Sequence, residues 1–334
     1  MKDFAGKIAF ITGGASGAGL GQAKVFAKAG MKVAIADFRI DALHNAVSEI
    51  VEFAGCDVGD VLPLCLDLTD RVAYTKAADS VEKIFGGPPH LLIQTAGNNS
   101  FGPIEASTFD DFDWVMSVCL GHVINGLVIF VPRMIRAYGG TDGVPKEEFH
   151  IATTSSMGAC EAGPATGPYS AAKAAVNNLM YSYAESLRIY GAGSTVLCPY
   201  NINSNIGETE LYRPEHLKNS GYNISEGTIA HLKAVHALGI DPVELAEILK
   251  EGIENRRVLV LPFRTYEEGY PFLHASTKRV EAYMLTEEER LKDAEDNESD
   301  PTHISNFFDI PDGGEPFGRA RKDLDFINEN RKPK

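Results

Sequence analysis

A glycine-rich loop lies between a short apolar run and a helical pattern near the start of the chain. The apolar run is Lys7–Thr12, the loop is Gly13–Gly19 and the helical pattern is Leu20–Ala29; a second apolar run, Met31–Ala36, follows. Short runs rich in branched and aromatic residues are typical of strands that are buried on both faces. The chain therefore begins with a predicted β-α-β unit, whose crossover is expected to be right-handed.

The alternation of strand and helix patterns continues along most of the chain. Further strands are predicted at Val61–Leu66, His90–Thr95, Phe149–Ser155, Ser194–Cys198 and Arg257–Leu261. Helical patterns cover 72–85, 109–138, 168–190 and 242–255. Pro132 is expected to bend the long second helix or to end its regular part. Strands that alternate with helices predict an α/β fold, here a doubly wound, Rossmann-like parallel sheet of seven strands.

One domain with a C-terminal extension is expected. The dinucleotide-binding domain is predicted over residues 1–265, with a substrate loop at about 200–240, because residues 201–224 show little periodicity and are interpreted as a mobile loop. The composition then changes, and residues 293–300 are densely acidic. We expect residues 266–334 to form an acidic extension without a catalytic role.

The composition argues against several partners. The chain of 334 residues has 31 Lys or Arg and 46 Asp or Glu, so its net charge is −15, which disfavours nucleic acids and anionic membranes. No apolar run is expected to be long enough to cross a bilayer, and no signal-peptide pattern precedes the first strand. Five scattered cysteines without a C-x-x-C pair indicate reduced thiols and a cytoplasmic location. Nine histidines without a ligand spacing predict no metal site.

The spacing within the glycine loop is typical of a dinucleotide site. Thr12, Gly13, Gly17 and Gly19 form T-G-x-x-x-G-x-G, one residue wider than G-x-G-x-x-G, after a strand and before a helix. Glycines allow the backbone to approach a pyrophosphate, whose charge then meets the helix N-terminus. The loop therefore predicts a dinucleotide as cofactor.

Two acidic residues at strand ends refine the choice of cofactor. Asp37 lies eighteen residues after Gly19, where a carboxylate can accept hydrogen bonds from the adenosine ribose. A carboxylate repels a 2′-phosphate, so NAD should be favoured over NADP, although Arg39 is close enough to reach such a phosphate. Asp67 ends the third strand and could reach the adenine amino group.

Tyr169 and Lys173 are four residues apart in a helical pattern, so they share one helix face. A tyrosine hydroxyl has a pKa near ~10, and an ammonium beside it stabilises the phenolate and lowers that pKa. The pair could therefore move a proton to or from a substrate oxygen. Ser156, at a predicted strand end, could hold the same oxygen.

Assembled in this order, the motifs resemble those of the short-chain dehydrogenase/reductase family over roughly residues 4–262. The matching features are the Thr12–Gly19 loop, Asp37, Asp67-Leu-Thr, Ala96-Gly97, Ser156, Tyr169, Lys173 and Pro199. The resemblance implies that Tyr169 is the acid/base, that Lys173 lowers its pKa and binds the nicotinamide ribose, and that Ser156 orients the substrate oxygen. It also implies NAD as the hydride carrier. The expected cofactor-binding residues are Thr12, Gly13, Ser16, Gly17, Gly19, Asp37, Phe38, Asp67, Leu68, Ala96, Gly97, Tyr169, Lys173, Pro199, Ile202 and Ser204.

The chain also departs from the family pattern. Gln94-Thr95 replaces Asn-Asn before Ala-Gly, and Cys119 replaces the helix asparagine that holds a water in a proton relay to the lysine. Cys119 is a poor donor, so the relay is expected to use water alone, a neighbour, or to be impaired. His122, one turn along, could substitute, although packing is the expected role. Tyr200 replaces the usual glycine after Pro199.

Within the family, several segments are similar to the bacterial Cα-dehydrogenases of lignin β-aryl ether breakdown, which oxidise a benzylic secondary alcohol to an aryl ketone with NAD. The segments are Ile11–Gly19, Asn99–Glu105, Asp110–Trp114, Gly167–Lys173 and Asn203–Ile206. An aromatic substrate would suit Phe101, Tyr200 and Tyr212 beside the expected pocket.

Two alternatives stay open. The substrate could be another bulky cyclic alcohol, such as a steroid or polyol, or the protein could be a catalytically weak NAD-binding sensor or scaffold, as Cys119 and Gln94-Thr95 suggest. The resemblance further implies a homodimer or homotetramer, in which helices 109–138 and 168–190 pack against their symmetry mates. A small alcohol or ketone is the other expected partner.

Overall fold

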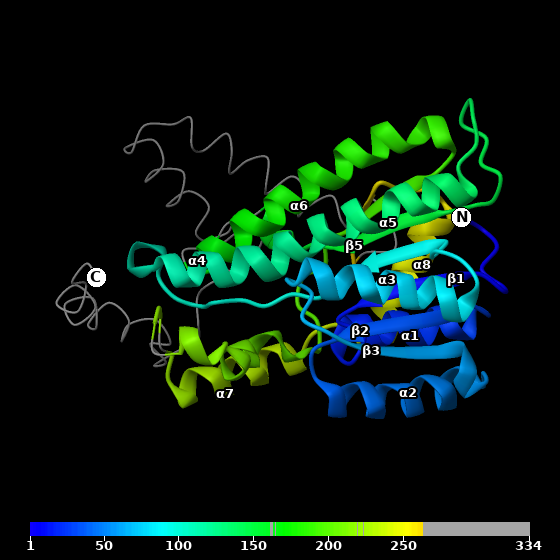
Figure 1. Cartoon of the computed structure of the whole chain (residues 1–334). Coiled ribbons are helices and arrows are strands. Elements are labelled where there is room, and N and C mark those ends of the chain that lie inside the picture. The colour runs from blue at the N-terminus through cyan, green and yellow to red at the C-terminus, as the bar shows by residue number, and fades with distance from the viewer. Residues whose placement is uncertain (161–162, 164, 219, 223, 263–334) are drawn as a thin grey trace. The chain divides into compact units, whose positions relative to one another are not determined.

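The computed structural model describes residues 1–160, 163, 165–218, 220–222 and 224–262. Within them the strands form one parallel sheet in the order β3-β2-β1-β4-β5-β6-β7 (Figure 1). The strands are β1 (Ile8–Thr12), β2 (Lys32–Asp37), β3 (Val61–Cys65), β4 (Leu91–Gln94), β5 (His150–Thr154), β6 (Gly193–Leu197) and β7 (Leu259–Val260). The predicted seven-stranded, Rossmann-like fold is confirmed. The strand order reverses between β1 and β4, which is where such sheets bind their ligands, outside the carboxyl ends of the strands.

Helices cover both faces of the sheet (Figure 1). One layer contains α1 (Gly17–Lys28), α2 (Ile40–Ala54) and α8 (Pro242–Glu254), and the other contains α3 (Arg71–Phe85), α4 (Phe109–Met116), α5 (His122–Tyr138) and α6 (Gly167–Ser186). Short 3₁₀ helices are η1 (Val58–Asp60), η2 (Ile104–Ala106), η4 (Met157–Ala159) and η5 (Leu187–Tyr190). Helix α2 is absent from the sequence prediction, although its buried residues Leu43, Ala46 and Ile50 recur with a helical period.

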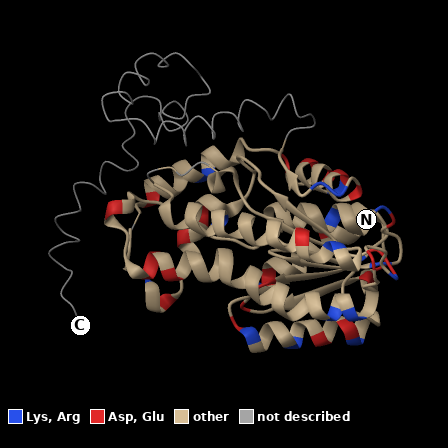
Figure 2. Cartoon of the chain, turned by 90° about the horizontal axis from the view of Figure 1, so that it is seen from above, with Lys and Arg blue, Asp and Glu red and all other residues tan. Residues whose placement is uncertain are grey.

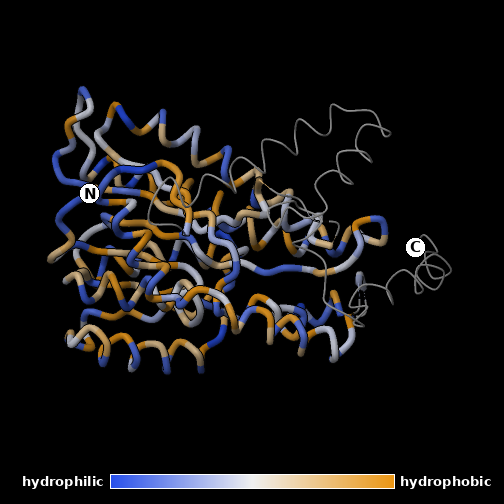
Figure 3. The backbone as a smooth tube through the Cα atoms, turned by 180° about the vertical axis from the view of Figure 1, so that it is seen from behind, coloured by the Kyte–Doolittle hydropathy of each residue, from blue (hydrophilic) through white to orange (hydrophobic). Residues whose placement is uncertain are grey.

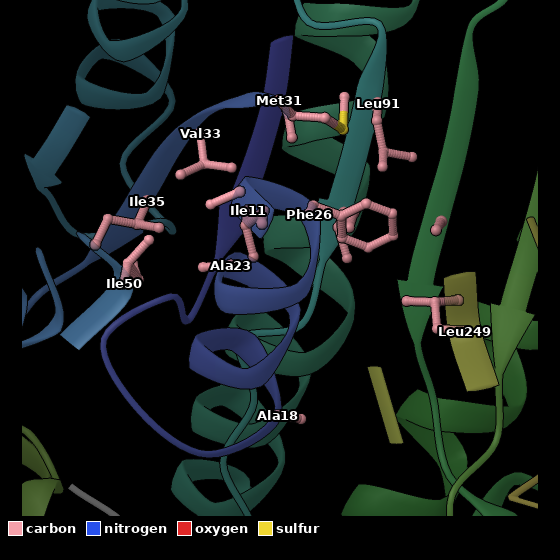
Figure 4. Close-up of a cluster of buried hydrophobic side chains, with 14 of the residues drawn as sticks. Ile11, Ala18, Ala23, Phe26, Met31, Val33, Ile35, Ile50, Leu91 and Leu249 are labelled. Carbon is pink, nitrogen blue, oxygen red and sulfur yellow. The ribbon is translucent and has the colours of Figure 1, made fainter. Parts of the chain in front are cut away.

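The core that supports the glycine loop lies between the sheet and α1. Figure 4 shows strand residues such as Ile11 and Val33 packed with Phe26 of α1, and Leu249 of α8 extends the same cluster. The apolar stretches follow the strands (Figure 3), whereas most charged residues lie on helices and loops (Figure 2). Lys32 and Asp37 are the two charged residues within the described strands. A carboxylate at the end of β2 is therefore an exception in an apolar sheet.

Helices α4 and α5 form one long helix, interrupted by the π-helical turn η3 (Ser117–Gly121). Pro132 was expected to bend this helix or to end its regular part; α5 continues through it to Tyr138, so the helix does not end there. The expectation that no apolar run could cross a bilayer is wrong by length and composition. In the part of the chain that the structure describes, Phe109–Tyr138 is the one helix that meets both criteria, and 56% of its most apolar window is buried. Such burial is typical of a core helix.

The region after β6 is more regular than predicted. Residues 201–224 were interpreted as a loop, but they contain the 3₁₀ helices η6 (Asn205–Tyr212) and η7 (Glu215–Leu217), and α7 (Glu226–Ala237) follows. Residues Met1–Val260 form one compact unit. The extension predicted over 266–334 lies outside the described residues.

Side chains complete the hydrogen bonds around the π turn. The backbone N–H of His122 donates to Ser117 O, so Val118 O lacks its usual helical donor and accepts instead from Nδ1 of the His122 ring. Gln94, at the end of β4, donates from Nε2 to the carbonyls of His122 (3.1 Å) and Val123 (2.9 Å). Gln94 and His122 thus fasten the irregular helix to the centre of the sheet.

Gly126 permits this close approach. A Cβ at this position would lie 2.6 Å from Gln94 Nε2 and 2.6 Å from the hydroxyl oxygen of Tyr74. Overpacking a core costs about 1–3 kcal/mol, so Gly126→Ala should lower the free energy of unfolding by about that amount although alanine is the better helix former. Urea denaturation would measure the loss. Gly59→Ala is the control, because nothing lies within 4 Å of its added Cβ, and an equal effect of both variants would contradict this account.

Candidate active site

The glycine loop has the shape that close approach of a ligand to backbone requires. Gly13 has a φ of +68°, and a Cβ there would lie 2.9 Å from Cα of Ala96. A Cβ on Gly19 would lie 2.2 Å from Gly13 O. Because α1 begins at Gly17, its unpaired N–H groups lie at the loop, where they attract an anion.

The hydroxyl group of Thr12 ties the loop to the neighbouring strand and to the long helix. Its Oγ1 accepts from the backbone N–H groups of Thr95 (2.9 Å) and Ala96 (3.2 Å). It lies 3.3 Å from Nε2 of His122. Since Nδ1 of His122 donates to Val118 O, Nε2 is the acceptor, and the Thr12 hydroxyl proton points to it. His122 therefore positions the loop.

Asp37 is bound by a residue of its own chain. It is 4% exposed, and Arg39 donates from Nε to Oδ1 (3.1 Å) and from Nη2 to Oδ2 (3.2 Å). Arg39 Nη2 also donates to Ser16 Oγ at 2.7 Å. Burial opposes the charge of Arg39, but Asp37 and then Tyr212 favour it, and the net result is a raised pKa. Asp37, the carboxylate expected to bind the ribose, is thus paired with Arg39, the residue that could otherwise have bound the 2′-phosphate of NADP.

The other expected cofactor residues line the same edge of the sheet. Asp67 is exposed, and its Oδ1 accepts from the N–H and hydroxyl of Thr69 at 2.8 Å, so it also shapes a turn. Asn125 of α5 donates to Leu68 O at 3.1 Å. Ser204 lies beside the glycine loop, because a Cβ added to Gly17 would be 3.0 Å from the Cβ of Ser204. Other contacts hold Pro199, whose carbonyl accepts from Met157 N–H, and Ile202, which forms a β-bridge with Ile240.

Ser156, Tyr169 and Lys173 come together beyond the end of β5. Lys173 Nζ donates to Thr154 O at 2.9 Å and lies 5.5 Å from the ring centroid of Tyr169, one turn earlier on α6. Ser156 Oγ accepts from Gly158 N–H at 3.0 Å, which fixes its position. Thr154 is itself linked to the loop side, because its hydroxyl oxygen lies 2.8 Å from that of Thr95.

The pKa of Tyr169 differs from the sequence expectation. Burial disfavours the phenolate and raises the pKa, while Lys173 and a hydrogen bond with Ser156 lower it without overcoming burial. The sequence argument counted the ammonium but not the loss of solvent. In the protein without cofactor, Tyr169 is therefore a protonated phenol at neutral pH.

Cys119 lies on the π turn beside the lysine. Its thiol donates to Asn98 O at 3.1 Å, and burial raises the pKa of Cys119, with Lys173 opposing. Both groups lie beside Gly97, where an added Cβ would be in ordinary contact, 3.6 Å from Lys173 Nζ and 3.7 Å from Cys119 Sγ. The space of the usual asparagine is thus filled by a protonated thiol that faces the loop after β4.

A buried ion pair beside the site was missed from sequence. Arg213 Nη2 and Asp111 Oδ1 are 2.9 Å apart, and their side chains are 1% and 0% exposed. Asp111 also accepts from Thr108 N–H and caps α4 in a reciprocal capping box. The Thr108-x-x-Asp111 spacing could have indicated the cap, but nothing in the sequence indicates its arginine partner.

A Rossmann-like sheet with a glycine loop and a serine, tyrosine and lysine at its carboxyl edge defines a dinucleotide-dependent oxidoreductase. Residues 7–213 match the family model described as short chain dehydrogenase, and the chain belongs to this family, as its sequence motifs indicated. It is 49% identical over 269 residues to the C alpha-dehydrogenase of Sphingobium sp. strain SYK-6, covering 80% of this chain and 84% of that protein.

Two solved structures are also similar. The apo form of LigD from Sphingobium sp. strain SYK-6 has 42% identity and a TM-score of 0.65, covering 83% of this chain and 97% of LigD. A short chain dehydrogenase/reductase from Burkholderia phymatum, in complex with NAD, has 28% identity and a TM-score of 0.74, covering 84% of this chain and 96% of that chain.

The buried His122 should make stability depend on pH. Burial lowers its pKa to about 3, despite the bond to Val118 O, whereas an unfolded histidine titrates near ~6.5. Between these values the unfolded state binds more protons, so this group makes the free energy of unfolding fall as pH falls, by up to about 1.4 kcal/mol per unit. His122→Gln should reduce that slope in urea titrations. His231→Gln, at an exposed position on α7, is the control, and equal slopes in the two variants would refute the assignment.

Proposed function

We propose that this protein is an NAD-dependent dehydrogenase that interconverts a benzylic secondary alcohol and its aryl ketone. The observation that carries the proposal is the placement of Lys173 Nζ 5.5 Å from the ring of Tyr169, beside a glycine loop that suits a dinucleotide. The substrate class comes from the C alpha-dehydrogenase that shares 49% identity with the chain. NAD, rather than NADP, is supported by the neighbour in complex with NAD and by the carboxylate of Asp37.

The described residues fit this cofactor. Gly13 and Gly19 leave backbone open where a Cβ would collide, and the N-terminus of α1 attracts the pyrophosphate. Asp37 and Phe38 would hold the adenosine end, and Lys173 the nicotinamide ribose. When bound, NAD accepts the hydride of the alcohol or returns it to the ketone.

The chain itself moves the proton. Tyr169 takes the hydroxyl proton of the alcohol during oxidation and returns it during reduction, and Lys173 stabilises the phenolate form. The Ser156 oxygen accepts from Gly158 N–H, so the serine hydroxyl proton can be donated to the substrate oxygen or to the Tyr169 phenol. Because burial raises the pKa of Tyr169, positive charge beside it must favour the phenolate before it can act as a base.

We further propose that the enzyme is a cytoplasmic homodimer or homotetramer, with neither nucleic acid nor membrane as partner. Apolar residues on α5 support an interface between copies, since Val128 is 63% exposed and Ile124, one turn away, is also exposed. The extension from residue 266 has no part in the proposed chemistry.

NADH absorbance measures the proposed reaction directly. With NAD, the protein should oxidise benzylic secondary alcohols faster than steroid or cyclic polyol substrates, and NADP should support a lower rate. Turnover with the steroid or polyol alone would favour the alternative substrate class. Tight NAD binding without turnover of any alcohol would favour a sensor and refute the proposed activity.

Tyr169→Phe removes the proton-transfer group and keeps the ring. General acid–base catalysis contributes about 10²–10⁴-fold, so kcat should fall by at least that lower factor while NAD binding, measured by calorimetry, stays within a factor of about two. Tyr183→Phe, on the same helix, is the matched control. A Tyr169→Phe enzyme as fast as the wild type would exclude Tyr169 as the acid/base.

A further inference from the structure

Tyr212 and Arg213 are neighbours in sequence and contact opposite sides of the proposed site. The Tyr212 ring lies edge-on to the Phe38 ring, with centroids 6.0 Å apart. Its centroid is 5.4 Å from Cζ of Arg39. Phe38 and Arg39 directly follow β2, so Tyr212 marks the adenosine end of the proposed NAD site.

Arg213 reaches the other side, where it is fixed by buried partners. It donates to Asp111 (2.9 Å) and Ser100 (3.3 Å) from its two terminal nitrogens. Its Nε donates to Leu217 O at 3.0 Å, and its Cζ lies 4.8 Å from the centroid of Trp114. Asp111 and Trp114 belong to α4, which continues into the π turn. Residues 205–218, the bridging segment, are therefore attached to the turn after β2 through Tyr212 and to α4 through Arg213.

Arg39 makes the first attachment sensitive to the cofactor. Its guanidinium uses both oxygens of Asp37 and the Ser16 hydroxyl while it faces the Tyr212 ring. A ribose hydroxyl that donates to Asp37 competes for the same carboxylate. An arginine whose charge is less compensated by a carboxylate is attracted more strongly to an aromatic face. Occupation of Asp37 should therefore strengthen the contact with Tyr212.

We propose that Tyr212 and Arg213 are positioning residues that couple NAD binding at Asp37 to the closure of the bridging segment over the alcohol. The proposal rests on the proposed function for the identity of the two ligands. Binding of NAD holds Tyr212 in place, and Arg213 carries that restraint to α4. Coupling of this kind is reciprocal, so the alcohol or ketone should tighten NAD binding by the same factor.

Amide hydrogen exchange tests the coupling without turnover. NAD should slow exchange over residues 205–218 by about fivefold or more in the wild type, and should not do so in Tyr212→Leu, which loses the aromatic face at an exposed position. Lys233→Gln is the matched control, because it breaks the exposed pair with Glu208 on the same segment and leaves Arg39 and α4 untouched. Equal slowing in all three proteins overturns the proposal, whatever the activity assay shows.

Kinetics test the second attachment. Arg213→Met should raise the KM for the benzylic alcohol about fivefold or more with kcat nearly unchanged. Arg213→Lys should recover part of this, because lysine can pair with Asp111 but cannot also reach Leu217 O and Ser100. An unchanged KM in Tyr212→Leu and in both Arg213 variants overturns the proposal, and if Arg213→Met does not fold, Tyr212→Leu and Arg213→Lys decide. A wild type that binds NAD but oxidises no alcohol refutes the proposed function, and the exchange result then stands alone.

Discussion

The hydroxyl group of Thr12 holds together the parts on which the site depends. It ends β1, accepts from two backbone N–H groups beyond β4, and faces a histidine nitrogen of α5. One small side chain thereby fixes the distance between the glycine loop and the loop after β4, which contains Gly97. Lys173 and Cys119 both pack beside that glycine, so the positions of the proposed catalytic groups follow from the same contact.

Much of the fold could be predicted because its signals are local. Each strand is a short apolar run. Asp241 before Pro242 has the residue types of a helix start, and in the structure its carboxylate accepts from the N–H groups of Val243 and Glu244. The π turn could not be predicted, because Ser117–Gly121 is ordinary helical sequence and the distortion depends on Gln94 from another strand. The local sequence does not distinguish a π turn from an α-helix here, and the contacts with Gln94 determine which of the two forms.

The site shows the same division. The glycine spacing and the Tyr169–Lys173 interval are local signals, and the structure places both features at the carboxyl edge of the sheet. The pairing of Arg213 with Asp111 joins residues 102 positions apart, and it has no sequence signature. Likewise, Arg39 was visible as a charge near Asp37, but only the structure shows that it uses both carboxylate oxygens. The raised pKa of Tyr169 could not be predicted, because it results from burial of the phenol, and the residue types alone do not show how deeply a side chain is buried.

The π turn divides the continuous helix formed by α4 and α5 into two parts whose side chains point in different directions around the helix axis. One extra residue in a turn rotates everything beyond it by about 100° relative to an uninterrupted helix. Val115 and Cys119 can thus face Ala172 of α6, while Val123, Leu127 and Phe130 remain turned to the protein interior. In a redesign of this helix or an alignment with relatives, the helical periodicity has to be counted separately in α4 and in α5. A one-residue deletion between 117 and 121 would turn one half by about 100° relative to the other, so that its buried face would no longer point to the protein interior.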